Sequence, residues 1–128
     1  MNTRDLHTYT LSLGTNMADG TLRLTECTRF LETILTDLSR SEIYSTPDIS
    51  HPESAPYTNM VVRGNCTLES DSLNALLKDY EKQCGRRHDS REVTIDIDLV
   101  MCDDTIIRPR DFAQTYFSIG YNQIIKNR

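Results

Sequence analysis

Two aspartates inside a stretch that otherwise reads as a β-strand have the clearest potential for chemistry. The stretch is TIDIDL, residues 94–99, and it places Asp96 and Asp98 two positions apart, although strands use aspartate rarely. Because strand side chains alternate between faces, both carboxylates stand on one face, about 7 Å apart, while Ile95 and Ile97 point to the other. Such a pair suits a divalent metal, above all Mg2+, which takes oxygen ligands together with substrate phosphates. A solvated face whose charges discourage edge-to-edge pairing is the structural alternative.

A basic loop directly precedes this strand. Residues 85–92, GRRHDSRE, contain four potential anion contacts, which are Arg86, Arg87, His88 and Arg91. Phosphoryl transfer relies on positioning and charge neutralisation, so guanidinium groups beside metal-binding carboxylates are typical of it. A solvated basic turn explains the loop alone, whereas the two features together favour a site for a metal-bound nucleotide.

Hydrophobic periodicity and turn residues predict the elements that position these groups. The predicted strands comprise residues 9–14, 39–47, 57–68 and 93–102. The predicted helices comprise residues 20–37 and 70–84, with a further short helix after Pro109, and residues 48–56 form a long loop. This order predicts an α+β fold, a ferredoxin-like β-α-β-β-α-β sandwich whose antiparallel sheet has two helices on one face and the active site on the open face.

The composition indicates a soluble globular protein with one domain, residues 1–128. Hydrophobic residues make up 38% and charged residues 26%, and the net charge of −5 argues against binding to nucleic acid, which needs a basic surface. We expect a cytoplasmic protein that does not enter a membrane, because no stretch has the length of a spanning helix or the pattern of a signal peptide. The cysteines are expected to be separate reduced thiols, and they are Cys27, Cys66, Cys84 and Cys102.

Four segments in order resemble the 6-hydroxymethyl-7,8-dihydropterin pyrophosphokinase family. The segments are SLGTN at 12–16, YSTP at 44–47 with YTN at 57–59, YEKQCGRRH at 80–88 and TIDIDLV at 94–100. The resemblance covers residues 9 to about 110. Members of this family belong to folate biosynthesis and transfer diphosphate from ATP to the hydroxymethyl group of a pterin, releasing AMP. The resemblance therefore implies small-molecule substrates, ATP and the pterin alcohol, and two Mg2+ ions.

The resemblance also implies a role for individual residues. Asp96 and Asp98 would bind the metal and, with Arg86, act in catalysis. The nucleotide would contact residues of the helix end, the basic loop and the tail, which are Glu81, Arg86, His88, Arg91 and Arg110. The pterin pocket would comprise Thr46, Pro47, Tyr57, Asn59 and Phe117. An asparagine offers both a donor and an acceptor, which suits the polar edge of a pterin.

Departures from the family pattern leave two further functions open. The family usually has Trp-Gly-x-Arg before the aspartates, whereas this chain has Ser90, Arg91, Glu92 and Val93 in a shorter loop and contains no tryptophan. One alternative is therefore a catalytically impaired paralogue that binds pterin or nucleotide. The other is a ferredoxin-like regulatory or RNA-binding module, although carboxylates on the open face repel phosphate unless metal intervenes.

Overall fold

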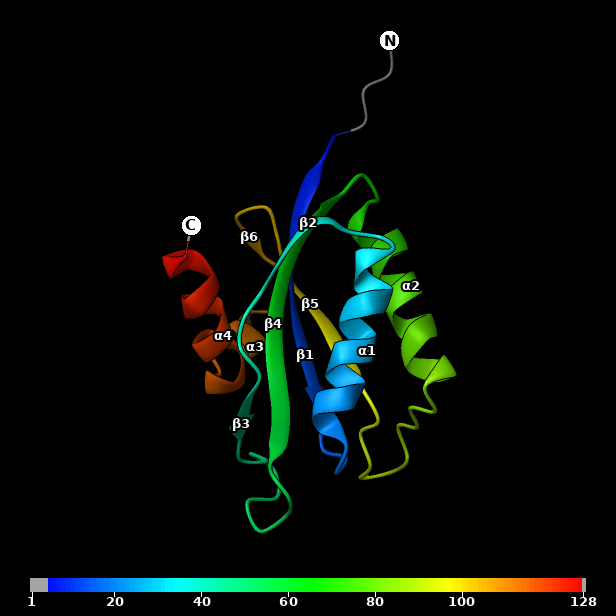
Figure 1. Cartoon of the computed structure of the whole chain (residues 1–128), viewed down its shortest axis with the longest axis vertical. Helices are drawn as coiled ribbons and strands as arrows, with labels where there is room; N and C mark the ends of the chain where they lie inside the picture. Colours follow the sequence, from blue (N-terminus) through cyan, green and yellow to red (C-terminus); the bar gives the residue numbers. More distant parts are fainter. Residues whose placement is uncertain (1–4, 128) are drawn as a thin grey trace.

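An antiparallel sheet forms the centre of the computed structural model, which describes residues 5–127 (Figure 1). Its strands are β1 (His7–Thr15), β2 (Thr36–Arg40), β3 (Tyr44–Thr46), β4 (Tyr57–Cys66), β5 (Asp96–Cys102) and β6 (Thr105–Ile106). The order in the sheet is β2-β4-β1-β5-β6, and β3 also pairs with β4. The helices are α1 (Gly20–Glu32), α2 (Ser70–Gln83), α3 (Pro109–Phe112) and α4 (Thr115–Lys126). The predicted ferredoxin-like α+β class is confirmed.

Helices cover both faces of the sheet rather than one. Helices α1 and α2 lie side by side on one face, and α3 and α4 lie across the other (Figure 1). The sheet is open, as predicted, although α4 packs on β4 and covers part of its second face. Within residues 5–127, none of the helices has the length and apolar character needed to cross a membrane.

The main core lies between the sheet and helices α1 and α2. Leu24, Cys27 and Leu31 recur at three- and four-residue spacing on α1 and are fully buried, as expected for the inner face of an amphipathic helix. Leu11 and Leu13 reach the same cluster from β1, because alternate residues of a strand share a face. This core fixes the sheet as a rigid platform for the residues on its other face.

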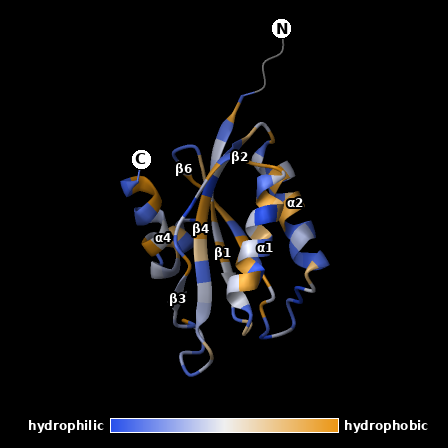
Figure 2. Cartoon of the chain, viewed as in Figure 1, coloured by the Kyte–Doolittle hydropathy of each residue, from blue (hydrophilic) through white to orange (hydrophobic). Residues whose placement is uncertain are grey.

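Strand β4 is buried on both faces, and its middle is orange, or hydrophobic, in Figure 2. Met60 and Val62 face the main core, whereas Val61 faces a second apolar cluster that includes Phe117 of α4. Helix α4 approaches β4 closely at Gly120, where an added Cβ would lie 2.7 Å from Val61 Cγ2. Only glycine fits at this crossing, so Gly120 sets how near α4 lies to the sheet.

The pairing of β5 with β1 contains a β-bulge. Leu11 pairs with Leu99 and Thr10 with Met101, which leaves Val100 as an extra residue. Up to Leu99 the predicted alternation holds, with the odd-numbered residues in the main core and the two aspartates on the opposite face. Beyond the bulge, Val100 and Met101 both join the cluster under α4.

Two predicted boundaries on the β2 side are wrong. The helix predicted to end at residue 37 ends at Glu32, and Asp37 has a positive φ of 52°, which a continuing helix does not allow. The strand predicted over 39–47 is split into β2 and β3. The Ser41 hydroxyl accepts a hydrogen bond from the backbone N–H of Val61 at 2.9 Å and takes the place of a strand partner there.

The start of β5 also differs from the prediction, which placed it at Val93. The backbone N–H of Val93 donates to Asn16 Oδ1 at 2.7 Å, and its carbonyl accepts from the Asn16 backbone N–H at 3.2 Å. The strand therefore begins at Asp96, after a segment that is tied to the loop following β1. The asparagine of the SLGTN segment thus anchors the loop that precedes the two aspartates.

Candidate functional site

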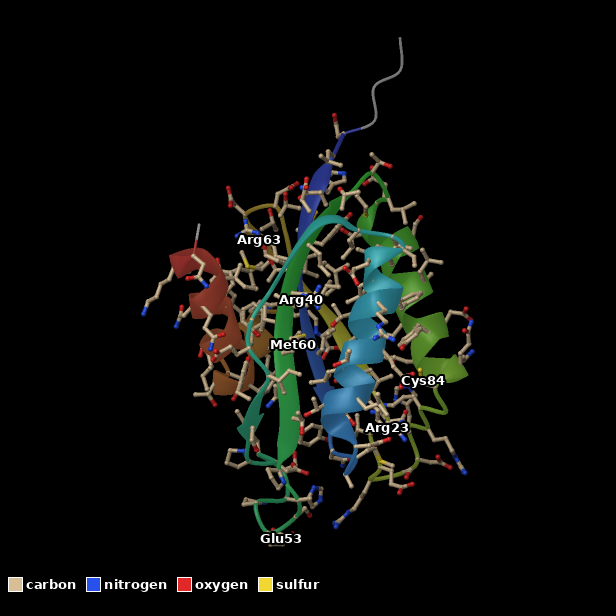
Figure 3. All side chains as sticks on the ribbon, in the orientation of Figure 1. Arg23, Arg40, Glu53, Met60, Arg63 and Cys84 are labelled. Carbon is tan, nitrogen blue, oxygen red and sulfur yellow. The ribbon has the colours of Figure 1, made fainter. Side chains whose placement is uncertain are left out.

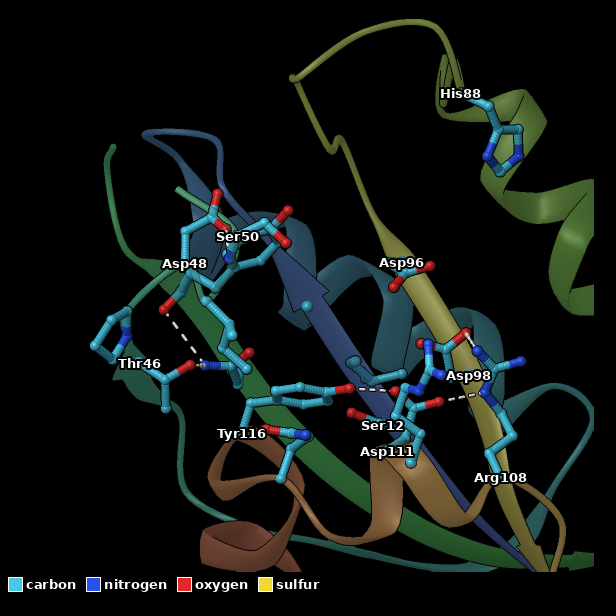
Figure 4. Close-up of a pocket in the computed structure, with 18 of the residues that line it drawn as sticks. Ser12, Thr46, Asp48, Ser50, His88, Asp96, Asp98, Arg108, Asp111 and Tyr116 are labelled. Carbon is cyan, nitrogen blue, oxygen red and sulfur yellow. Dashed lines mark hydrogen bonds and ion pairs between the residues drawn. The ribbon is translucent and has the colours of Figure 1, made fainter. Parts of the chain in front are cut away.

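A cavity of about 570 Å³ opens on the face of the sheet that α4 leaves uncovered (Figure 4). Its walls come from β1, β4, β5, the loop after β3, the middle of α2 and the segment from residue 108 to 116. Eight of the residues predicted from the sequence to form the site line this one cavity: Thr46, Pro47, Tyr57, Asn59, His88, Asp96, Asp98 and Arg110. The fold thus gathers side chains that lie more than sixty residues apart in the sequence.

Asp96 and Asp98 form the charged floor of the cavity. They pair with Gly14 and Ser12 of β1, and both point from β5 into the open space (Figure 4). Burial raises the pKa of both carboxyls, and burial followed by the charge of its neighbour raises the pKa of Asp98 to about 7. Two desolvated carboxylates this close together are stable only beside cations.

Lys78 is one of those cations, and sequence reasoning missed it. Its Nζ lies 3.7 Å from Asp98 Oδ1 and donates to Glu81 Oε2 at 3.0 Å and to the Ile97 carbonyl at 2.8 Å. These contacts hold the ammonium at the edge of the cavity, between α2 and β5. A lysine three residues before a glutamate is a common helix-surface pair, so only the packing of α2 on β5 reveals its role.

Glu81, which the resemblance implied to contact the nucleotide, lies outside the cavity lining and is hydrogen-bonded to β5. Its side chain is buried, and Oε2 accepts hydrogen bonds from the Ile97 backbone N–H at 2.6 Å and from Lys78. Both hydrogen bonds are accepted by the same oxygen, Oε2, which lies between α2 and β5. It ties α2 to the strand that carries both aspartates.

The segment from residue 108 to 116, here called the tail, supplies a second cation and an aromatic side chain for the wall of the cavity. Arg108 Nη2 lies 3.8 Å from Asp98 Oδ1, and Arg108 Nε donates to Asp111 Oδ2 (Figure 4). The Tyr116 hydroxyl donates to the other oxygen of Asp111, and the Tyr116 carbonyl accepts from the Tyr44 hydroxyl at 2.6 Å. The tail is therefore connected to the carboxylate pair by a continuous chain of charged and polar groups.

The aromatic residue in this wall is Tyr116, which corrects the expectation that Phe117 contacts the pterin. Phe117 is fully buried and packs against Phe112 and Tyr121, with ring centroids 5.6 and 5.2 Å away. Neighbouring helix residues point about 100° apart, so Tyr116 faces the cavity while Phe117 faces the sheet. The signal in the sequence is the helical spacing of Phe117, Gly120 and Ile124, which places Phe117 on the buried side of α4.

Asn59 lies at the other end of the cavity and is almost completely buried. Its Nδ2 donates to Thr46 Oγ1 at 2.7 Å, and this bond fixes the amide against the loop that follows β3. Gly14 lies opposite Asn59 in the sheet, and a Cβ at Gly14 would approach Asn59 Oδ1 to 3.4 Å. The missing side chain leaves room beside Asn59 Oδ1 for a flat polar ligand.

The basic side chains of residues 85–92 do not all line the same cavity. His88 lines the main cavity, whereas Arg86 and Arg91 line a neighbouring hollow of about 660 Å³. The two hollows share Asp48, Ser50 and Tyr57 in their walls. A ligand as long as a nucleoside triphosphate could extend from the cavity toward these two arginines. The fourth residue of the loop, Arg87, instead pairs with the exposed Asp89 at 3.0 Å.

The donor set of the cavity floor fits a hard divalent cation. Asp96 and Asp98 offer carboxylate oxygens from a single rigid strand, and burial and mutual repulsion oppose their ionisation unless a cation is near. Mg2+ is commonly held by one or two carboxylates and completes its coordination with water and phosphate oxygens. Lys78 and Arg108 both lie near the same oxygen of Asp98, Oδ1, which leaves Oδ2 available to a metal.

Comparison with known protein families finds a match over most of the chain. A family model described as 7,8-dihydro-6-hydroxymethylpterin-pyrophosphokinase (HPPK) matches residues 10–125. None of the curated proteins matches the chain. The matched range includes every residue of the cavity described above.

Proposed function

Because the chain belongs to the 7,8-dihydro-6-hydroxymethylpterin-pyrophosphokinase (HPPK) family, we propose that it is an active, Mg2+-dependent cytoplasmic enzyme of folate biosynthesis. It transfers diphosphate from ATP to the hydroxymethyl group of 6-hydroxymethyl-7,8-dihydropterin and releases AMP. The observation that carries the proposal is the cavity in which the partly buried pair Asp96 and Asp98 faces strands β3 and β4, which hold Thr46 and Asn59.

The pterin is assigned to the end of the cavity between Asn59 and Tyr116. This end combines an amide with a fixed orientation, a hydroxyl at Thr46 and aromatic side chains at Tyr57 and Tyr116. Small-molecule pockets are typically apolar with a few precisely placed polar groups, which is the composition expected for a flat heterocycle with a polar edge. Pro47 contributes to the same wall.

The triphosphate is assigned to the carboxylate end of the cavity and the hollow beyond it. Bound Mg2+ held by Asp96 and Asp98 would neutralise charge that develops on the transferring group. The chain itself contributes His88 and Arg110 in the cavity and Arg86 and Arg91 in the neighbouring hollow as phosphate-binding side chains. These groups bind and orient an anion, which is most of what phosphoryl transfer requires of a protein.

In the proposed reaction the pterin hydroxymethyl oxygen attacks the β-phosphorus of ATP. The new bond joins that oxygen to phosphorus, the bond to the α-phosphate oxygen breaks, AMP leaves, and the alcohol proton passes to solvent. Holding the two substrates at fixed ends of one rigid cavity supplies the effective concentration for this displacement. The protein needs no side chain as a covalent nucleophile.

The experiment is an assay of AMP formation with ATP, Mg2+ and the pterin alcohol. We expect AMP and the pterin diphosphate in equal amounts, and we expect Asp98→Asn to reduce the rate at least about a thousandfold because the metal-binding oxygen is lost. Binding of the pterin and of a non-hydrolysable ATP analogue is measured in parallel by calorimetry. Binding without AMP would assign the chain to the alternative, an impaired paralogue, which the altered segment Ser90 to Val93 favours.

A further inference from the structure

A second group of metal-ligand side chains lies at the opposite end of the sheet from the cavity. His7 at the start of β1, Cys102 at the end of β5 and Asp103 directly after it each offer one ligand atom within 4.8 Å of the other two. Gly14, the partner of Asp96, lies seven positions after His7 along β1, which is about 23 Å of extended strand. We propose that these three side chains, here called the His7 cluster, bind a divalent transition metal of the Zn2+ type.

The distances within the His7 cluster suit a tetrahedral metal. His7 Nδ1 lies 3.2 Å from Asp103 Oδ2, and Cys102 Sγ lies 3.8 Å from the same oxygen. Zinc bonds of about 2.0–2.1 Å to nitrogen or oxygen and about 2.3 Å to sulfur place tetrahedral ligands about 3.3 Å apart for N···O and about 3.6 Å apart for S···O. Both distances to Asp103 Oδ2 therefore lie within a few tenths of an ångström of these values, and the three donor atoms all lie within 4.8 Å of one another.

The second nitrogen of His7 is placed as metal-ligating imidazoles require. Among the described residues, His7 Nε2 is buried without a hydrogen-bond partner, and it lies 3.8 Å from Glu69 Oε1. When Nδ1 binds metal, the ring proton resides on Nε2 and faces this carboxylate. A carboxylate behind the distal imidazole nitrogen is the usual outer partner of a histidine ligand and raises its basicity. The hydrogen bond between His7 Nδ1 and Asp103 does not by itself account for the placement of His7 Nε2 near a carboxylate.

The backbone already holds Asp103 in the ligating position. Its Oδ1 accepts from the Thr8 backbone N–H at 2.9 Å, and its own N–H donates to the Thr8 carbonyl. Its φ of 55° allows this double contact. Oδ1 is thereby occupied and Oδ2 is directed at His7, so the carboxylate loses little freedom on binding a metal.

The chemistry of the donors distinguishes this site from the magnesium site. A thiolate and an imidazole select Zn2+, Co2+ or Cu2+ over Mg2+, whereas a pair of carboxylates prefers Mg2+. Cys102 is partly exposed, so an ion can enter and water can complete the coordination. A bound ion would connect the start of β1 with the turn between β5 and β6, and it is independent of the proposed reaction.

The test is a titration of the tag-free protein with Co2+ in excess Mg2+, which keeps Asp96 and Asp98 covered. We expect one equivalent to produce thiolate-to-cobalt charge-transfer absorption and visible bands of tetrahedral intensity, and Zn2+ to abolish both. We expect Zn2+ also to protect the Cys102 thiol from alkylation, which is measured by peptide mass spectrometry on the unmodified wild-type chain. At about a hundredfold excess over its Kd, Zn2+ should raise Tm by about 10 °C.

Variants identify the ligands. Cys102→Ser should remove the charge-transfer band, and Glu69→Gln should weaken Co2+ binding about 10- to 100-fold, as loss of an outer partner does. The controls are Cys84→Ser, whose thiol lies at the C-terminal end of α2 (Figure 3), and Asp104→Asn in the same turn, and both should bind Co2+ as the wild type does. Absence of a thiolate band, or a band that persists in Cys102→Ser, overturns the proposal. So does unchanged alkylation of wild-type Cys102 in Zn2+.

Discussion

Replacement of Glu81 tests whether this residue positions the site or contacts the nucleotide. Glu81→Ala removes the acceptor for the buried Ile97 N–H and the main partner of Lys78. Hydrogen bonds to charged groups contribute about 1.5–3 kcal/mol each, and Glu81 accepts two of them, one from the buried backbone of Ile97 and one from the partly exposed Lys78. We therefore expect Glu81→Ala to lower the free energy of unfolding by about 3–5 kcal/mol.

The expected change in melting temperature follows from the size of the chain. An unfolding entropy of about 2.1 cal/mol/K per residue gives about 0.27 kcal/mol/K for 128 residues, so each kcal/mol corresponds to about 4 °C. Glu81→Ala should then melt about 10–20 °C below the wild type. Glu81→Gln keeps an oxygen for the Ile97 N–H but loses the charge facing Lys78, and it should melt about 4–8 °C lower.

Thermal and urea unfolding of the metal-free protein measure these differences, with Asp79→Ala as the matched control. Asp79 is an exposed carboxylate on the same helix, and its removal should change stability by less than about 0.5 kcal/mol. The reasoning fails if Glu81→Ala melts within about 2 °C of the wild type, a shift of about 0.5 kcal/mol, while its affinity for an ATP analogue falls. In that case Glu81 contacts the nucleotide, as the family resemblance implied.

Three further predictions concern the floor, the tail and the aromatic wall of the cavity. Asp98 has a folded-state pKa of about 7 and an unfolded one of about 4, so the folded state binds more protons in between, and the stability of metal-free protein should fall as pH rises through this window. In urea unfolding with EDTA, Asp98→Asn should lack this fall and be about 1–3 kcal/mol more stable than the wild type at pH 8; equal pH profiles would contradict it. Gly120→Ala should destabilise by about 1–3 kcal/mol, since its Cβ would strike Val61, although the same change in an open helix stabilises. Tyr116→Ala should weaken pterin binding in calorimetry at least about tenfold, whereas Phe117→Leu should reduce stability by about 1 kcal/mol and leave pterin affinity within about twofold.

The sequence predicts best where a local pattern and the fold impose the same requirement. The alternation in TIDIDL placed both aspartates on one face and the isoleucines in the core, and the structure agrees. Proline-containing residues 48–56 were correctly read as a loop, whose tip at Glu53 extends away from the sheet (Figure 3). In both cases the period of side chains or the chemistry of a turn determines the structure without distant partners.

Prediction failed where a residue acquires its role only through packing. Lys78 and Arg108 flank Asp98 because α2 and the tail arrive there from opposite sides, and nothing in their own neighbourhoods encodes this meeting. The cover that α4 provides was missed although a signal existed. Phe117, Gly120 and Ile124 recur at helical spacing and form the buried side of α4.

The bulge at Val100 interrupts the alternation of side chains between the two faces of β5. Before it, the even-numbered Asp96 and Asp98 face the cavity; after it, Met101 faces the apolar cluster under α4. Because Leu99 pairs with Leu11 and Met101 with Thr10, deleting Val100 would remove the bulge and leave Asp96, Asp98, Met101 and Cys102 on the faces that they now occupy. When homologous chains are aligned or β5 is grafted into another scaffold, a one-residue gap therefore belongs at Val100, because a gap at a paired residue of β5 would move the side chains on one side of it to the opposite face.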